Sequence, residues 1–237
     1  MGHSKGKTAA FFDVDGTIVN ATIVHYYVKF RLLLLPAILR PFWLIGFIPK
    51  VVYYLFLDKI SRTKFNQVFY RNYRGMPAEK IKHLAEETFY TSLRPKIFPS
   101  AIDRICEHKK RNDHLVLMTG SLEFIIQPLA DYLKVDDVLA VNLSEKNGKF
   151  TGELTTQPLG GEDKARAIKA FAEQNDIDLT SSYAYGDSPA DLPMLRCVGN
   201  PVVINPGKVL RRVATELKWE IQEWSVDDSL EHSPETK

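Results

Sequence analysis

The chain has 237 residues, of which 45% are hydrophobic and 25% are charged, enough apolar material for one large domain or two small ones. Its formal net charge of +2 gives no global field that would attract nucleic acid. Two cysteines and six scattered histidines provide neither a disulfide framework nor a zinc-binding pattern. We therefore expect a protein of a reducing compartment, the cytoplasm.

An apolar run near the N-terminus ends in two carboxylates. Phe12 is followed by Asp13 and, after one intervening residue, by Asp15, and the chain then turns at Gly16. We predict a buried parallel strand over residues 8–15, with both acids at its carboxyl end, where open α/β sheets hold their ligands. Adjacent carboxylates also suit Mg²⁺, which prefers hard oxygen ligands. The pair alone leaves a solvated turn open as the alternative.

Residues 20–94 show helical patterns only, and their first half is unusually apolar. We expect Pro36, Pro41 and Pro49 to break these helices. Charged residues interrupt the apolar stretch, so that no uncharged run approaches the 18 residues of a spanning helix.

The apolar residues within 32–57 admit two interpretations. They either form the packed interior of a helical subdomain or lie as a helical hairpin in a membrane interface. A segment of about 75 residues has little interior for so many large side chains, which favours the membrane. The side chains expected at headgroup level are Arg31, Arg40, Trp43, Lys50, Tyr53 and Tyr54.

After residue 94, helical and strand patterns alternate. We predict helices over 99–112, 122–133, 164–174, 191–196 and 208–217, strands over 115–119, 183–185 and 201–204, a short hairpin over 138–154, and an edge strand over 219–221. This alternation predicts an α/β fold with a doubly wound parallel sheet. Residues 225–237 are rich in Asp, Ser, Glu and Pro, and we expect a disordered tail there.

Further polar motifs follow two of these strands and open one helix. They are Thr119-Gly120-Ser121, Lys164 after two glycines, and the run Gly186-Asp187-Ser188 with Asp191 three residues on. Their order and their positions at strand ends favour a catalytic role for Asp13 and Asp15 over a solvated turn.

This ordered set resembles the four motifs of the haloacid dehalogenase-like hydrolases. The run that begins at Gly186, with the later Asn205-Pro206, resembles their phosphoserine-phosphatase-like branch. The resemblance implies a discontinuous catalytic core of residues 1–19 and 95–224, with residues 20–94 inserted after the first motif as a helical cap. It also implies a phosphoric monoester hydrolase that works through an aspartyl-phosphate intermediate.

The resemblance assigns roles to the motif residues. Asp13 would attack phosphorus, and Asp15 would act first as general acid and then as general base. Mg²⁺ would be held by Asp13, the backbone carbonyl of Asp15, Asp187 and Asp191. The phosphate oxygens would be bound by Thr119, Gly120 and Lys164.

Substrate class is harder to infer. Phosphoserine phosphatases carry a Glu shortly after the first motif, whereas Thr22 stands at the corresponding place here, and no acid lies between Asp15 and Asp58. A substrate ammonium would lack a partner, which disfavours phosphoserine.

The stretch Met118–Ser121, with an aliphatic cap, resembles bacterial phosphatidylglycerophosphate phosphatases. We therefore favour a lipid phosphate of the lysophosphatidate, phosphatidate or phosphatidylglycerophosphate type, with the protein peripheral on the cytoplasmic membrane face. A small soluble phosphate ester, or phosphotransfer through the same intermediate, remains open as an alternative.

Overall fold

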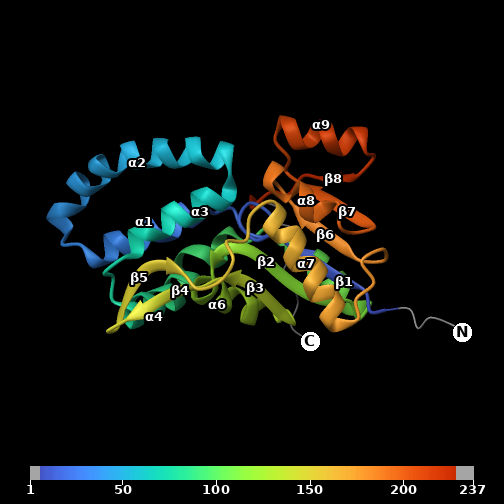
Figure 1. Cartoon of the computed structure of the whole chain (residues 1–237), viewed down its shortest axis with the longest axis horizontal. Coiled ribbons are helices and arrows are strands. Elements are labelled where there is room, and N and C mark those ends of the chain that lie inside the picture. The colour runs from blue at the N-terminus through green and yellow to red at the C-terminus, as the bar shows by residue number, and fades with distance from the viewer. Residues whose placement is uncertain (1–5, 228–237) are drawn as a thin grey trace, which may run out of the picture.

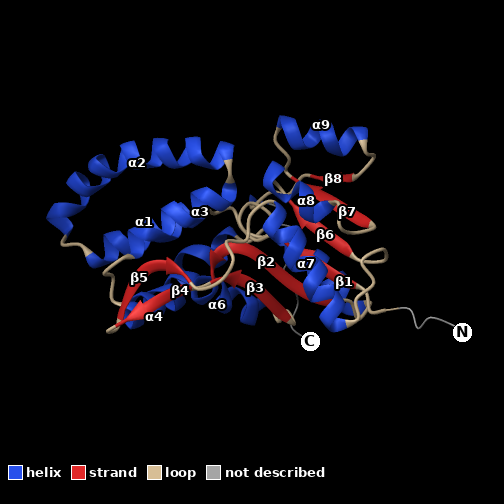
Figure 2. Cartoon of the chain, in the orientation of Figure 1, coloured by secondary structure: helices blue, strands red, loops and turns tan. Residues whose placement is uncertain are grey.

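The computed structural model describes residues 6–227, and a six-stranded parallel sheet lies at its centre (Figures 1 and 2). The strand order is β3-β2-β1-β6-β7-β8. The strands are β1 Ala9–Phe12, β2 His114–Leu122, β3 Asp137–Val141, β6 Tyr183–Gly186, β7 Asn200–Ile204 and β8 Glu220–Gln222. All neighbouring strands in it pair in parallel, which confirms the predicted sheet.

Helices cover both faces of this sheet because its buried side chains alternate. Phe12 and Leu117 face the side packed by α5 Pro99–Lys110 and α6 Glu123–Leu133. Phe11 and Val116 face the other side. That side is packed by α7 Glu162–Asn175, α8 Leu192–Leu195, which follows the 3-10 turn Pro189–Asp191, and α9 Lys208–Glu216. The arrangement is therefore doubly wound.

The predicted hairpin over 138–154 is wrong in its first part. Residues 137–141 form β3, which pairs in parallel with β2 in the main sheet. The hairpin consists of β4 Leu143–Lys146 and β5 Lys149–Leu154, and it turns at Asn147 and Gly148, both of which have positive φ. Alternating apolar residues suit either kind of pairing, so the pattern did not separate β3 from the hairpin.

The segment between β1 and β2 is helical. It contains α1 Ile23–Leu34, a 3-10 turn Ala37–Leu39, α2 Arg40–Ile60, α3 Arg62–Tyr70, a 3-10 turn Arg71–Tyr73, α4 Ala78–Thr88, a π turn Phe89–Leu93 and a 3-10 turn Arg94–Lys96. The β4–β5 hairpin joins this layer, because Phe150 exchanges backbone hydrogen bonds with Gly75 and Met76. We call the helical segment the cap; its division from the core at residues 20 and 94 stays a prediction.

Helix α2 corrects the expectation that Pro41 and Pro49 break the helices of the apolar stretch, since Pro41 lies in its first turn. Pro49 does not break it, since α2 continues through this residue to Ile60. Together with the preceding turn, Ala37–Ile60 is the one helix in the described part of the chain that is long and apolar enough to cross a membrane by length and composition. Such a helix is by itself weak evidence for a membrane span.

Most apolar side chains of α2 point away from the protein. Figure 1 shows α2 on the outer side of the cap, farthest from the sheet. Phe42 is 71% exposed and Ile45 67%. Trp43 and Tyr54, expected at headgroup level, instead face inward: Trp43 stacks on Phe47, and Tyr54 packs against Phe69. Only the side chains on the inner side of α2 are therefore buried in the cap interior.

Candidate active site

The predicted catalytic residues converge on one cavity of about 290 Å³ between the sheet and the cap. It lies beyond the carboxyl ends of β1, β2 and β6, because Asp13, Gly120 and Asp187 adjoin those ends. The core lines it with Asp13, Asp15, Gly16, Gly120, Leu159, Gly160, Lys164, Asp187, Ser188, Ala190 and Asp191, and residues 20–66 add Asn20, Ala21, Thr22, Ile23, Arg62 and Asn66.

Asp13 is held in place by groups from three segments. Its backbone N–H donates to Tyr185 O at 2.9 Å, which extends the pairing of β1 with β6. Lys164 Nζ lies 2.5 Å from Asp13 Oδ1, and Thr17 Oγ1 donates to Oδ2 at 3.2 Å. Burial raises the pKa of Asp13 to about 7 in the absence of a metal, although Lys164 opposes the shift. Oδ1 of Asp13 is therefore paired with the ammonium of Lys164, and the carboxylate of Asp13 borders the cavity.

Asp15 lies in a different environment from Asp13. Its Oδ2 accepts hydrogen bonds from Ser121 Oγ at 2.5 Å and from Thr119 Oγ1 at 3.2 Å. Burial raises the pKa of Asp15, and these hydroxyls only partly offset the shift. A carboxyl that keeps its proton toward neutral pH can donate it to a leaving group. The environment of Asp15 thus fits a general acid.

Asp187 and Asp191 complete a carboxylate cluster with Asp13, in which one ligand atom from each residue lies within 4.8 Å of the others. Asp191 Oδ1 binds Lys164 Nζ at 2.7 Å, and Asp191 Oδ2 accepts from the Ser188 hydroxyl at 2.8 Å. Although burial acts to raise it, the pKa of Asp191 is lowered by Lys164 and Ser188. Burial, and then Asp13 and Asp191, raise the pKa of Asp187 well above its ordinary value.

This donor set fits a divalent cation. The cluster has three carboxylates and one ammonium, that of Lys164, so negative charge remains in excess where Asp13 and Asp187 meet. Hard oxygen donors around uncompensated charge are what Mg²⁺ requires. Lys164 and Ser188 occupy the oxygens of Asp191, and Lys164 and Thr17 those of Asp13, whereas Asp187 accepts, within the described chain, only from Thr17 at 3.4 Å and is the freest of the three.

The predicted phosphate-binding residues separate in the structure. Gly120 and Lys164 line the cavity. Thr119 is fully buried, and its Oγ1 donates to Asp15 and accepts from the Ser121 N–H at 2.9 Å. A contact between Thr119 and phosphate stays a prediction. The structure places its hydroxyl beside the proposed acid.

The sequence motifs did not identify the contributions of Ser121, Arg62 and Asn66. Ser121 was part of a recognised motif, but its hydrogen bond to Asp15 depends on how β2 ends. Arg62 and Asn66 come from α3 in the cap, which carries no motif. The one sequence feature that could have pointed to Arg62 and Asn66 is their spacing, since polar residues four apart lie on the same face of a helix.

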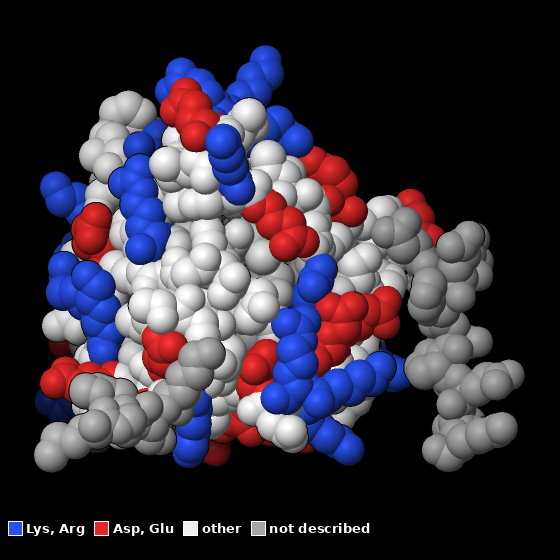
Figure 3. All heavy atoms as spheres, turned by 90° about the vertical axis from the view of Figure 1, so that its right-hand side faces the viewer, with Lys and Arg blue, Asp and Glu red and all other residues white. Residues whose placement is uncertain are grey.

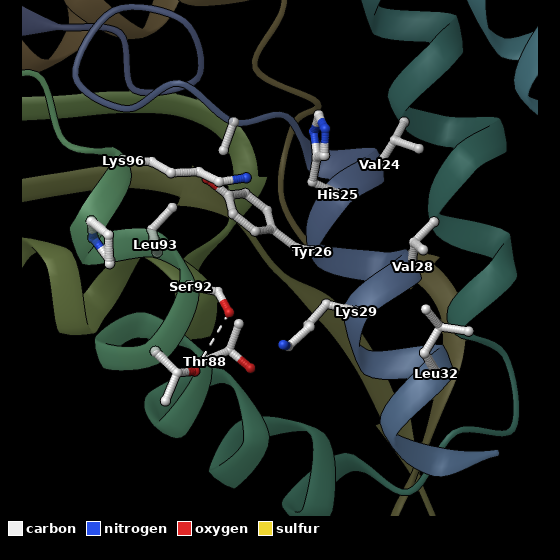
Figure 4. A pocket seen from close by; sticks show the side chains of 13 residues that line it. Val24, His25, Tyr26, Val28, Lys29, Leu32, Thr88, Ser92, Leu93 and Lys96 are labelled. Atoms are coloured by element: carbon white, nitrogen blue, oxygen red, sulfur yellow. Dashed lines mark hydrogen bonds between the residues drawn. The ribbon is translucent and has the colours of Figure 1, made fainter. Parts of the chain in front are cut away.

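A second, apolar groove of about 550 Å³ runs along α1. Figure 4 shows Val24, Val28 and Leu32 on this helix, and Lys29 pointing across toward Thr88. Ala21 lines both the groove and the catalytic cavity, so the two adjoin. A ligand that extends from the catalytic cavity would find an apolar surface beside it.

Comparisons with known proteins agree on one family. A sequence model of the haloacid dehalogenase-like hydrolases matches residues 10–196. A probable phosphatase of Mycobacterium tuberculosis is 31% identical, over 95% of this chain and 78% of its own. A phosphoserine phosphatase of the same species is 27% identical, over 92% and 71%. The structure of a substrate-bound phosphoserine phosphatase superposes with a TM-score of 0.70 at 18% identity, over 96% of this chain and 98% of that one.

The crowding of carboxylates predicts a stability change on removing one of them. A carboxyl whose pKa is raised by folding destabilises the metal-free protein as pH rises above its unfolded value of about 4. Asp187→Asn should therefore raise the metal-free Tm at pH 7 by about 2 °C or more, and the gain should shrink as pH falls toward about 4.

Calorimetry with and without Mg²⁺ measures this effect. Mg²⁺ should raise the Tm of the parent protein and leave that of Asp187→Asn almost unchanged. The exposed acid Asp103 on α5 provides the control, Asp103→Asn, which should behave like the parent. A lower metal-free Tm for Asp187→Asn would contradict the assignment of excess negative charge.

Proposed function

The chain is a phosphatase of the haloacid dehalogenase-like hydrolase family, and we propose that it acts through an aspartyl-phosphate formed on Asp13 with Mg²⁺ as cofactor. The observation that carries this proposal is the division of labour between two neighbouring acids. Asp13 borders the cavity beside a buried lysine, whereas hydroxyls surround Asp15. Different surroundings for paired carboxylates are the usual means of giving them different catalytic roles.

The chemistry proceeds in two steps. A carboxylate oxygen of Asp13 attacks phosphorus, the bond from phosphorus to the ester oxygen breaks, and the leaving alkoxide takes the proton of Asp15. Asp15, now ionised, accepts a proton from water as that water attacks phosphorus, which releases inorganic phosphate and restores Asp13. The ammonium of Lys164 offsets negative charge on the phosphoryl oxygens. Mg²⁺, held by Asp13 and Asp187, supplies further neutralisation of phosphoryl charge when bound.

Replacing the two acids should give different kinetic results with p-nitrophenyl phosphate. Asp13→Asn should lower kcat by about three orders of magnitude or more, because the nucleophile is lost. Asp15→Asn should release one burst of p-nitrophenolate per active site and then stall, because this leaving group needs no acid whereas hydrolysis of the intermediate needs a base.

Stopped-flow absorbance detects the burst, and mass spectrometry of the quenched protein locates the phosphate on the peptide that contains Asp13. Asp103→Asn serves again as the control with normal turnover. Near-normal kcat in Asp13→Asn, or full activity of the parent in excess EDTA, would exclude this mechanism.

We further propose that the substrate is an amphiphilic phosphate ester presented at a membrane. Two features support this choice over a small polar metabolite. The groove along α1 offers an apolar surface next to the catalytic cavity. The cap lines that cavity with no carboxylate to meet an ammonium, such as the one that phosphoserine carries.

The outer half of α2 supports contact with a lipid surface. Its exposed side chains from Phe42 to Phe56 are apolar over about half of the helix circumference, given 100° per residue; besides these two they are Leu44, Ile45, Ile48, Val52, Tyr53 and Leu55. The cations Arg40 and Lys59 stand at its two ends, Lys50 lies between them and donates to Asn72, and no acid precedes Asp58 within the helix. Apolar side chains between terminal cations complement an anionic leaflet.

The opposite end of the molecule has a different surface. Figure 3 shows it from the right-hand side of Figure 1, with basic and acidic side chains both scattered over it. Among residues 6–227, the exposed large apolar residues all lie between Leu33 and Tyr90 except Tyr132, Val209 and Leu217.

Membrane contact through α2 can be tested by sedimentation with phosphatidylcholine vesicles that contain phosphatidylglycerol. The parent protein should pellet with them and partly resist high salt, because each large apolar side chain that inserts gains on the order of 1.5–3 kcal/mol and this gain is not screened. Phe42→Ser, Ile45→Ser and Ile48→Ser together should reduce binding by tenfold or more.

The matched control changes Val209 and Leu217 of the α9 region, also exposed and apolar, to Ser, and should leave binding intact. Both variants should hydrolyse p-nitrophenyl phosphate at the parent rate. If the parent ignores vesicles and instead forms dimers that the triple variant abolishes, a second copy covers α2 and the membrane proposal is wrong.

A further inference from the structure

Helix α3 presents a row of polar side chains to the catalytic cavity. Arg62 and Asn66, four residues apart and therefore on one face, both line the cavity from the cap side. Tyr70 continues the row, and its hydroxyl donates to Gly120 O at 2.6 Å. At the start of the helix, Thr63 Oγ1 donates to Asp163 Oδ2 at 2.6 Å. Hydrogen bonds at both ends thus fix this face over the end of β2, which carries Gly120, and the start of α7, which carries Lys164.

Asn66 has an unused donor at the cavity. Its side chain is 1% exposed, and its Nδ2 has no hydrogen-bond partner among residues 6–227. The amide lies directly on Gly120, where an added Cβ would come within 2.5 Å of Nδ2. A buried donor without an acceptor costs stability, so its position at the cavity points to a ligand that supplies the acceptor.

Arg62 adds a cation beside this donor. Its Nε pairs with Asp58 Oδ1 at 2.9 Å, and its Cζ lies 5.7 Å from the centroid of the Phe65 ring. Its two Nη groups donate no hydrogen bond among residues 6–227. Its side chain lies against Gly160, where a Cβ would come within 2.7 Å of Cγ. The remaining guanidinium donors can bind an oxyanion in the planar manner that arginine favours.

We propose that Arg62 and Asn66 recognise a second oxyanion, a carboxylate or a phosphodiester, that the substrate carries close to its scissile phosphate. The inference rests on the proposed phosphatase function and narrows its substrate class. Arg62 and Asn66 line the cavity from the cap, whereas Lys164 of α7 and Asp187, which follows β6, line it from the core, so we expect the leaving group to meet the two cap residues. A phosphodiester attached to a glycerol phosphate satisfies this requirement and also the amphiphilic character argued above.

A matched set of small esters tests this recognition without a membrane. Phosphoglycolate and ethyl phosphate carry a carboxylate and a methyl group, respectively, on the CH2 that bears the ester oxygen. Phosphoethanolamine carries an ammonium one bond farther from the ester. The parent protein should favour phosphoglycolate over ethyl phosphate by about tenfold to a hundredfold in kcat/KM, the range expected for charge-assisted hydrogen bonds. Phosphoethanolamine should be the poorest of the three.

Variants then assign the preference to these two residues. Arg62→Met should bring the ratio of phosphoglycolate to ethyl phosphate close to one, and Arg62→Lys should restore part of it. Asn66→Asp should shift preference toward phosphoethanolamine. Arg212→Met, on the exposed face of α9, is the control and should keep the parent ratio. Calorimetry should show that every variant folds.

The outcomes separate this inference from the function on which it rests. A parent protein that hydrolyses p-nitrophenyl phosphate but shows no preference for phosphoglycolate overturns the recognition site alone. A ratio that persists in Arg62→Met, with all three esters slowed equally, shows that Arg62 acts on the phosphoryl group and also overturns it. A parent inactive on every ester, p-nitrophenyl phosphate included, removes the proposed function, and the inference falls with it.

Discussion

The buried ammonium of Lys164 is the interaction on which the rest of the site depends. It joins Asp13 at the end of β1 to Asp191 after β6, two acids that come from different strands and would otherwise repel each other. Its salt bridges raise the pKa of Lys164 although burial opposes this, so the cation persists at any working pH. Buried charges are stable only when paired in this manner, and the pairing determines how the strand ends meet.

The single positive charge of Lys164 does not neutralise the three carboxylates of the cluster. This excess of negative charge connects the stability of the protein to its function. The effect is clear at Asp187, where burial and the neighbouring acids disfavour the ionised carboxylate. A site built to receive both a cation and a phosphate is expected to be strained while empty, because functional sites trade stability for preorganised charge. The cap increases this strain by excluding water, which strengthens every charge interaction within the cavity.

The core was predictable because three catalytic motifs lie at the carboxyl ends of strands and the fourth, that of Lys164, opens a helix. Buried strands that end next to or within the motifs of Asp13, Thr119 and Asp187 must bring these motifs to one edge of a parallel sheet, whatever the loops do. The sequence could not show that β3 belongs to this sheet, since its apolar pattern suits a hairpin equally well. It also could not show that α2 continues through Pro49, where packing of Phe47 and Tyr54 against the cap outweighs one lost hydrogen bond. Cap residues such as Asn66 could not be predicted as site residues, because they reach the cavity only when α3 packs on the core.

The cap has two unlike faces that share one interior. Tyr27 of α1 and Tyr54 of α2 both pack on Phe69 of α3, with ring centroids 5.6 and 5.3 Å apart. Through this aromatic layer, α2, whose outer side is apolar, packs against α3, whose inner side presents Arg62 and Asn66. Packed aromatic side chains resist deformation because interiors are dense. The outer surface of α2 and the polar row of α3 therefore keep a constant separation, so a surface that receives α2 also fixes the distance to the catalytic carboxylates.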